Sequence, residues 1–319
     1  IAAIVLGAAA GYFFQSRHHQ EAPVLPAAAP KQEEPPAADN EPLTRFPVPP
    51  STAAESEPAE PLPTMQESDP ALYIKGMNNL LTAHFFNMHY GKFCRALEEL
   101  ETFWQDNDAS FNEQTRTLAF VHTYTAKINK HFLEGTFTEG LKIVPEVMER
   151  IRVNRMRMDK HRALVFYYKI ACLYFGSGDN NTAIEYLNKI INLKNGNLRA
   201  DIQCFARILH LIAHYELKNY YLTEYLLKSV YHFIAKNKDL SLVMEEILNF
   251  LRKFNHLSAR EIRPAFKHLK ERLELIAKNP YERRSYLYLD IVSWLESKIN
   301  RRPVQDVIHE KFLKKVPRI

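Results

Sequence analysis

Apolar residues recur at helical spacing along most of this chain, from residue 72 to the end. They return at positions i, i+3, i+4 and i+7, which is the pattern of a helix with one buried face. Glycine is scarce, with nine in 319 residues, and the segments between the apolar runs are short. The pattern therefore predicts an all-α fold for this part of the chain.

The clearest unit spans residues 164–195 and has the pattern of two helices joined by a tight turn. The turn is Ser177-Gly178-Asp179, and Asp179 or Asn180 is suited to cap the second helix. Small residues let the two helices approach closely, and aromatic residues fill the space between units. The apolar positions of the two helices are Tyr167, Ile170, Ala171, Tyr174, Ala183, Leu187 and Ile190.

Four short stretches share this template about forty residues apart. Each has a turn, then an aromatic residue or Asn, then a small residue that opens an apolar run; they are residues 90–97, 134–141, 177–184 and 217–224. The small residues fall at 96, 140, 183 and 223, so the spacings are 44, 43 and 40. A helix–turn–helix unit of this kind buries its apolar face by stacking on copies of itself. The recurrence therefore predicts an α-solenoid over residues 72–238.

Residues 73–235 resemble the tetratricopeptide-repeat family. In that family large, Leu, Gly/Ala and Tyr positions on helix A face Ala, Phe and Ala positions on helix B. The seven apolar residues of the unit at 164–195 take those places, and Asn195 stands where the family has a final Pro. The spacing exceeds the usual 34 residues, which predicts helices that are longer by one or two turns.

The resemblance implies a concave groove that binds a protein or peptide through helix A residues. Carried over residue by residue, the candidates are Tyr168, Cys172, Phe175, Phe132, Asn129, Ile208, Ile212 and Tyr215. This surface is apolar and aromatic, unlike the basic clamps that grip carboxylate tails. A second interpretation stays open, because lengthened repeats twist differently and place such residues in the core.

The repeat pattern weakens after residue 238. Residues 242–254, 259–277, 284–299 and 304–316 each have the periodicity of an amphipathic helix. An open end of a solenoid exposes its core, so we expect residues 239–319 to form a helical capping region.

The amino-terminal part of the chain differs from the rest. Residues 1–14 are an unbroken apolar run, and a spanning helix needs about 20 such residues, so the run predicts a truncated transmembrane anchor. A signal-peptide core and a buried helix of a soluble domain are the alternatives. The aromatic residues at 12–14 fit a membrane interface better than a cleavage site.

Residues 15–71 have the composition of a disordered linker. Thirteen of the eighteen prolines lie before Ala71, and few apolar residues are available to bury. Residues 1–72 hold three basic and ten acidic residues, a charge of −7, so the remainder of this +5 chain carries +12. This difference in composition and charge leaves open whether residues 1–72 and 73–319 are natively one protein.

Residues 60–71 resemble the junction in a family of single-pass bacterial inner-membrane proteins of unknown function. There, an apolar helix and a Pro/Ala tether precede such a segment. The resemblance implies a bacterial inner-membrane location. It does not determine on which side the folded domain lies, with the periplasmic side slightly favoured.

The densest basic run lies between the second and third units. It consists of Arg150, Arg152, Arg155, Arg157, Lys160 and Arg162. Such a run suits phosphates or an acidic partner. No nucleic-acid motif accompanies it, so a solvated helix face is the favoured interpretation.

The sequence contains no recognisable catalytic or cofactor motif. His210 and His214 have the i, i+4 spacing of metal ligands but lack a third ligand, and three cysteines in separate units indicate small buried side chains. We therefore expect a protein that is not an enzyme and carries no metal or cofactor. The function predicted is a membrane-tethered scaffold or assembly factor that binds a protein or peptide. The alternative is a nucleic-acid-associated helical protein that uses the basic run.

Overall fold

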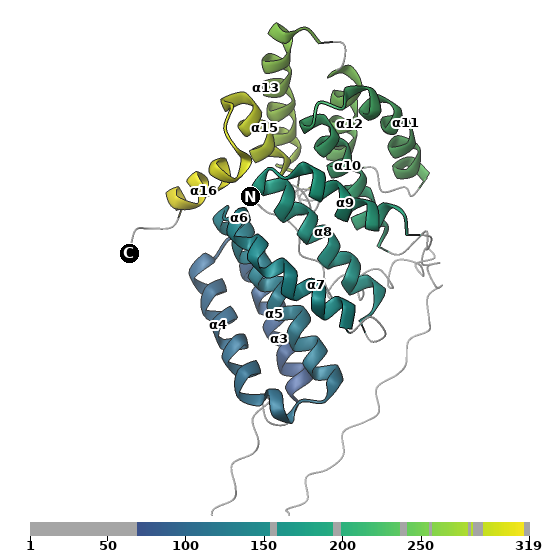
Figure 1. Cartoon of the computed structure of the whole chain (residues 1–319). Helices are drawn as coiled ribbons and strands as arrows, with labels where there is room; N and C mark the ends of the chain where they lie inside the picture. Colours follow the sequence, from purple (N-terminus) through teal and green to yellow (C-terminus); the bar gives the residue numbers. More distant parts are fainter. Residues whose placement is uncertain are drawn as a thin grey trace, which may run out of the picture.

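The computed structural model describes residues 69–153, 158–193, 199–236, 241–254, 257–279, 282 and 290–315. Within these ranges the secondary structure consists of α-helices and two short 3₁₀ segments, and no strand is present. The all-α prediction is therefore confirmed for the described part of the chain (Figure 1).

The first part of the described chain folds into helical hairpins that lie side by side. Helices α3 and α4, α8 and α9, and α10 and α11 pack as pairs, and neighbouring pairs contact each other through α3 and α5, α6 and α8, and α9 and α10. The turns of the last three hairpins fall in the recurring stretches at 134–141, 177–184 and 217–224, and the turn of the first hairpin, residues 87–89, directly precedes the stretch at 90–97. The bounds are α3 (Pro70–Phe86), α4 (Tyr90–Asn107), α5 (Glu113–Glu134), α6 (Phe137–Gly140), α7 (Val144–Val153), α8 (Lys160–Ser177), α9 (Asn180–Ile191), α10 (Ala200–Glu216) and α11 (Tyr220–Lys236).

Four helices follow the hairpins: α12 (Leu242–Phe254), α13 (Ala259–Ile276), α15 (Ile291–Asn300) and α16 (Val304–Lys315). Three of the predicted helices match these bounds to within one residue. The fourth was predicted at 284–299, but in the described chain α15 begins at Ile291, after a cap at Asp290. Residues 284–289 lie outside the described residues.

Short polar residues fix where several helices begin. The side chain of Asp69 accepts a hydrogen bond from the Leu72 amide at 2.9 Å, and that of Asn112 accepts one from Thr115 at 2.8 Å. Asp179, one of the two predicted caps, accepts from the Thr182 amide at 3.0 Å. Each contact satisfies an amide that has no partner inside its helix, so these starts are encoded locally.

The second helix of the second hairpin is broken, unlike its counterparts. It is divided into α6, a 3₁₀ segment over Leu141–Ile143, and α7. Pro145 follows the break and has no amide hydrogen to donate to the preceding turn, which accounts for the tighter segment.

Small residues allow close packing between neighbouring hairpins. Ala171 and Ala183 are completely buried, as predicted for the helix contact at residues 164–195. A Cβ atom at Gly176 of α8 would lie 2.1 Å from the ring of Phe137 of α6. The contact between the second and third hairpins therefore requires glycine at position 176.

The last helix returns to the beginning of the array. Helix α16 packs against α5 and α8, and in Figure 1 it lies beside α6 and above α4. Nδ1 of His309 donates to the carbonyl oxygen of Glu134 at 2.6 Å, and the ring of Phe312 lies 4.8 Å from that of Tyr90. These contacts lie at the turns of the first two hairpins. Helix α16 therefore packs against the start of the described chain.

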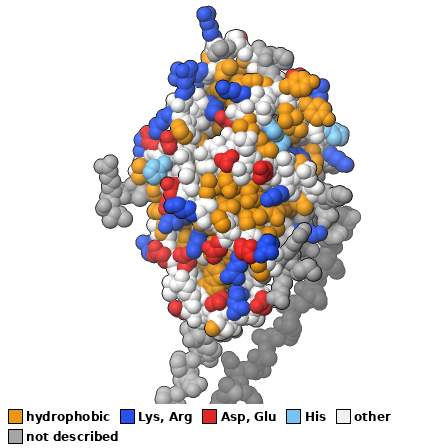
Figure 2. Space-filling model, in the orientation of Figure 1, with side chains coloured by type: hydrophobic (Ala, Val, Ile, Leu, Met, Phe, Trp, Pro, Cys, Tyr) orange, Lys and Arg blue, Asp and Glu red, His pale blue; other side chains and the backbone are white. Residues whose placement is uncertain are grey.

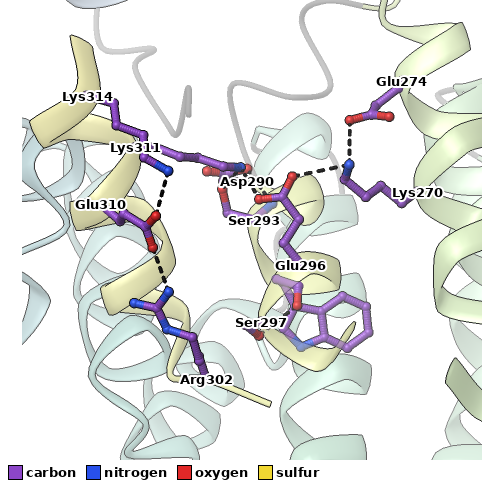
Figure 3. A network of polar contacts seen from close by, with 11 residues as sticks. Lys270, Glu274, Asp290, Ser293, Glu296, Ser297, Arg302, Glu310, Lys311 and Lys314 are labelled. Carbon is purple, nitrogen blue, oxygen red and sulfur yellow. Dashed lines mark hydrogen bonds and ion pairs between the residues drawn. The ribbon is translucent and has the colours of Figure 1, made fainter. Parts of the chain in front are cut away.

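A polar network joins α13, α15 and α16 (Figure 3). Nζ of Lys311 contacts Oγ of Ser293 at 2.9 Å and Oε2 of Glu296 at 2.6 Å. Oε1 of Glu296 also lies 3.3 Å from Nζ of Lys270. The Glu296 carboxylate of α15 therefore links α13 to α16.

The predicted anchor at 1–14 and residues 15–68 of the linker predicted at 15–71 lie outside the described residues. The end of that predicted linker is wrong, because Pro70 and Ala71 form the first turn of α3, which Asp69 caps. Among the helices that are described, none is both long enough and apolar enough to span a bilayer. The membrane anchor and the inner-membrane location stay predictions.

Candidate functional site

All eight residues predicted to line a concave groove are buried. They are Asn129, Phe132, Tyr168, Cys172, Phe175, Ile208, Ile212 and Tyr215. None of these side chains is open to a partner in this structure, so the expected exposed groove is not observed at these positions. Their burial agrees with the interpretation that longer repeats place them in the interior.

Two of these residues surround a buried lysine that the sequence did not single out. Nζ of Lys169 donates to Oδ1 of Asn129 at 2.5 Å and lies 5.5 Å from the ring centre of Phe132. Burial lowers the pKa of Lys169 to about 7, and burial also raises the pKa of the Cys172 thiol. Lys169 has no solvent exposure, so this cluster is unsuited to bind a solute from outside.

The other predicted candidates for chemistry are also interior residues. The rings of His210 and His214 meet edge to face, 4.5 Å apart, and burial lowers the pKa of His210 to about 4. Within the described ranges, no group of three His, Cys, Asp or Glu side chains has the geometry of a metal site. Tyr215 joins an aromatic cluster with Phe254 and Trp294, which ties α10 to α12 and α15.

The basic run is partly neutralised by neighbouring carboxylates. Both Nε and NH2 of Arg152 contact Glu149, at 2.8 and 2.7 Å, and Nε of Arg162 lies 3.9 Å from Asp159. The guanidinium of Arg150 lies 5.7 Å from the ring centre of Phe120, and Lys160 is exposed. Arg155 and Arg157 lie outside the described residues. These pairings are those of a solvated helix surface.

The most exposed aromatic residues lie on α11, and the sequence analysis did not select them. Tyr221 is 91% exposed and Tyr225, one turn later, is 73% exposed. Tyr220, Leu222 and Tyr231 on the same helix are also exposed. Figure 2 shows hydrophobic side chains gathered at the upper right, over the position of α11 and α12. Several exposed aromatic side chains on one helix are typical of an interaction surface.

A groove of about 520 Å³ lies between α11 and α12; Tyr231 lines it, and Tyr221 and Tyr225 lie on the same helix outside its lining. Leu227 of α11 and Leu251 of α12 are buried and form its apolar floor. Its other lining residues are exposed and form the two sides: Glu224, Lys228, Tyr231, His232 and Ala235 of α11, and Arg252 of α12. The groove residues that α11 supplies occupy positions i, i+4, i+7 and i+8, which lie on one face of a helix.

The two helices that form the groove each supply one cation, Lys228 from α11 and Arg252 from α12. The guanidinium of Arg252 lies 5.5 Å from the ring centre of Tyr231, which holds it over the groove. Within the described part of the chain, neither Lys228 nor Arg252 forms an ion pair. Arg272 of α13, by contrast, pairs with Glu246 on α12.

The periodicity of α11 carried a signal for this surface. Thr223, Leu227 and Val230 are the buried positions of the fourth unit, so the 3.6-residue period places Tyr221, Tyr225 and Lys228 on the opposite face. Aromatic residues on the predicted solvent face of an amphipathic helix were the available clue. The sequence holds no comparable clue that α12 packs against α11, because that contact depends on the tertiary fold.

Comparisons with protein-family models, curated proteins and solved structures find no significant match to this chain. The exposed tyrosines, the groove and its charges mark α11 and α12 as the candidate functional surface.

Proposed function

We propose that this chain is a protein-binding scaffold, built from tetratricopeptide-like helical hairpins, which contacts its partner through the surface of α11 and α12. The observation that carries the proposal is the exposure of Tyr221 and Tyr225 beside an apolar groove. The class of function is the one predicted from the repeats. The surface differs, because the predicted groove residues are buried.

Tyrosine is a suitable anchor for a protein interface. Its ring supplies a large apolar contact, and few rotatable bonds have to be ordered when it is buried by a partner. Interfaces are enriched in tyrosine, and truncating such anchors commonly costs about 2 kcal/mol or more of binding free energy. Tyr221 and Tyr225, one turn apart, and Tyr231, which lines the groove, supply three anchors on α11.

The membrane tether is the second part of the proposal. It is supported by the apolar run at 1–14 and the proline-rich segment after it. A tether of this kind holds the helical domain near a bilayer while α11 and α12 contact a partner. The bacterial inner membrane is the proposed location.

Site-specific photocrosslinking tests the binding surface. A photoreactive phenylalanine analogue is placed at Tyr225 in the full chain, and at Glu149 as a control on an exposed helix elsewhere. Irradiation in the native cell is expected to give a discrete protein adduct from position 225 and none of the same size from position 149. The adduct is expected to disappear when Tyr221 and Tyr231 are both replaced by Ala.

Two outcomes would contradict the proposal. One is the same adducts from both positions. The other is adducts at position 225 that survive the tyrosine substitutions. Circular dichroism of the Tyr221→Ala, Tyr231→Ala variant provides the folding control, since exposed side chains contribute little to stability.

A further inference from the structure

We infer that the groove between α11 and α12 receives an amphipathic segment of another protein that presents apolar residues to the groove floor and carboxylates to its two sides. The inference rests on the proposed function, because it names the chemistry of the partner for the same surface. Three features of the groove carry it: the floor, the unpaired cations and the length of the lined face.

The floor selects apolar side chains. Leu227 and Leu251 are buried below the opening, and the methyl group of Ala235 and the ring of Tyr231 line the side of α11. A charged side chain placed on this floor loses its hydration without gaining a partner. An occupant therefore places leucine-like or aromatic residues inside the groove.

The sides select carboxylates. Lys228 of α11 and Arg252 of α12 both line the groove, and within the described residues neither has an anionic partner. Other cations of the described chain are paired, as Lys298 is with Glu216 and Arg302 is with Glu310. An acidic residue on each flank of the occupant would form ion pairs with Lys228 and Arg252. Hydrogen bonds between such charged groups are stronger than those between neutral groups.

Glu224 and His232 are the remaining polar residues of the lining. Glu224 lies one turn before Lys228 on α11, so the amino-terminal end of the α11 side is acidic and the middle is basic. The occupant therefore carries its carboxylates opposite Lys228 and Arg252, and a neutral or basic residue next to Glu224.

The length of the face matches a short helix. Positions 224 to 235 of α11 span about 16 Å at a rise of 1.5 Å per residue. A partner helix of about three turns covers this distance and brings apolar residues to the floor at i, i+3 or i+4 and i+7. This is the helix-in-groove mode of peptide recognition.

Peptide display on the full chain tests the inference with random sequences as probes. A library of random peptides of about 16 residues is selected on the wild-type chain, after depletion on a chain that carries Lys228→Glu and Arg252→Glu. The expected result is enrichment of acidic sequences with apolar residues at helical spacing. Enrichment of neutral or basic sequences, or no enrichment over the depleted pool, would overturn the inference.

Exchanging the charges between the chain and the tightest-binding selected peptide tests the ion pairs directly. Fluorescence anisotropy is expected to show at least a tenfold loss of affinity for the Lys228→Glu, Arg252→Glu chain, which is about 1.4 kcal/mol. Replacing the Glu residues of the peptide by Lys is expected to restore binding to that chain. Lys253→Glu is the matched control, because Lys253 is exposed on α12 next to Arg252 but does not line the groove, and it is expected to change affinity less than twofold.

Other occupants are separate outcomes of the same measurements. If a peptide of residues 53–69 competes with the selected peptide, the occupant is the chain's own acidic segment. If the chain forms a concentration-dependent dimer that Tyr225→Ala abolishes, the occupant is a second copy of the chain. Either result would overturn the inference. If the photocrosslink at position 225 persists while the charge variants bind normally, the acidic chemistry is wrong and the binding surface stands. If the photocrosslink fails, the proposed function itself fails.

Discussion

The stacked hairpins are held mainly by apolar contacts, whereas the returning C-terminal helices add hydrogen bonds and ion pairs to their apolar contacts. Where α8 packs on α9 and α10, the contacting side chains are small or apolar and completely buried, as with Ala171, Ala183, Leu187 and Ile190. Where α15 meets α10, Nε1 of Trp294 donates to Glu216 at 2.6 Å and Lys298 pairs with the same carboxylate. The contact of α16 with α5 likewise uses a hydrogen bond from His309.

This difference implies that the two regions respond to different perturbations. An apolar contact depends on volume, because buried side chains have no room for extra atoms and gain little from charge. A polar contact at partial exposure depends on geometry and on salt, since solvent and ions compete for the charges. The predictions below separate these two responses.

The largest effect is expected from filling the space at Gly176 between two hairpins. A Cβ at this position would lie 2.1 Å from the Phe137 ring, so Gly176→Ala is expected to destabilise the chain by about 1–3 kcal/mol. Gly76→Ala is the matched control, because a Cβ there meets nothing within 4 Å in helix α3, and it is expected to stabilise by up to about 1 kcal/mol. Urea unfolding of both variants gives the comparison, and equal shifts would contradict the packing of α6 on α8.

The attachment of α16 is tested at Gly135. This residue has a φ of 72°, and a Cβ would lie 2.5 Å from the backbone nitrogen of His309. Gly178 has a φ of 95° but open space around a Cβ, so Gly178→Ala reproduces the backbone strain without the clash. Hydrogen exchange of α16 amides is expected to accelerate at least tenfold in Gly135→Ala and to stay unchanged in Gly178→Ala. Equal protection in the two variants would show that α16 does not dock at this turn.

The buried lysine of the array gives a pH signature. The pKa of Lys169 is lowered from 10.5 to about 7 in the folded chain, so the unfolded chain binds the proton more strongly. Stability is therefore expected to rise between about pH 7 and 8.5, by up to about 1.4 kcal/mol per pH unit. Denaturant unfolding at several pH values is expected to show a smaller slope for Lys169→Met, while the exposed control Lys228→Met keeps the slope. A slope that Lys169→Met leaves unchanged would contradict the burial of this amine.

The smallest effect is expected at the ion pairs of α15 and α16. Lys311 contacts Glu296 at 2.6 Å with both side chains partly exposed, so Lys311→Met is expected to cost about 0.2–1 kcal/mol. The cost is expected to shrink as the salt concentration rises, whereas that of Gly176→Ala stays constant. Lys314→Met is the control, since Lys314 is largely exposed and is expected to have almost no effect. A cost at Lys311 that is independent of salt would contradict a charge-based attachment.

The helices and their turns were predictable because they depend on residues close together in the sequence. Asp69, Asn112 and Asp179 each cap a helix through an amide three residues away, and the apolar period identifies the buried face. The broken helix at Leu141–Ile143 was missed, although Pro145 lies beside it, because the apolar pattern continues across the break.

The candidate site was predicted poorly because exposure depends on the whole fold. A tetratricopeptide-like register placed Tyr168, Ile208 and Ile212 in an open groove, whereas the structure buries them. Tyr221 and Tyr225 were identifiable as solvent-facing from the period of their helix, but an exposed tyrosine marks a surface only where a groove lies beside it.

The sequence by itself determined that the described part of the chain is all-helical with tight turns between paired helices, since caps, turns and apolar spacing act within a few residues. The tertiary structure decided that α16 returns to α5 and that α12 forms one side of a groove with α11. His309 and Glu134 are 175 residues apart, and no local pattern specifies that they meet. Such contacts arise only when the packing of all the intervening helices brings two distant surfaces to the same place.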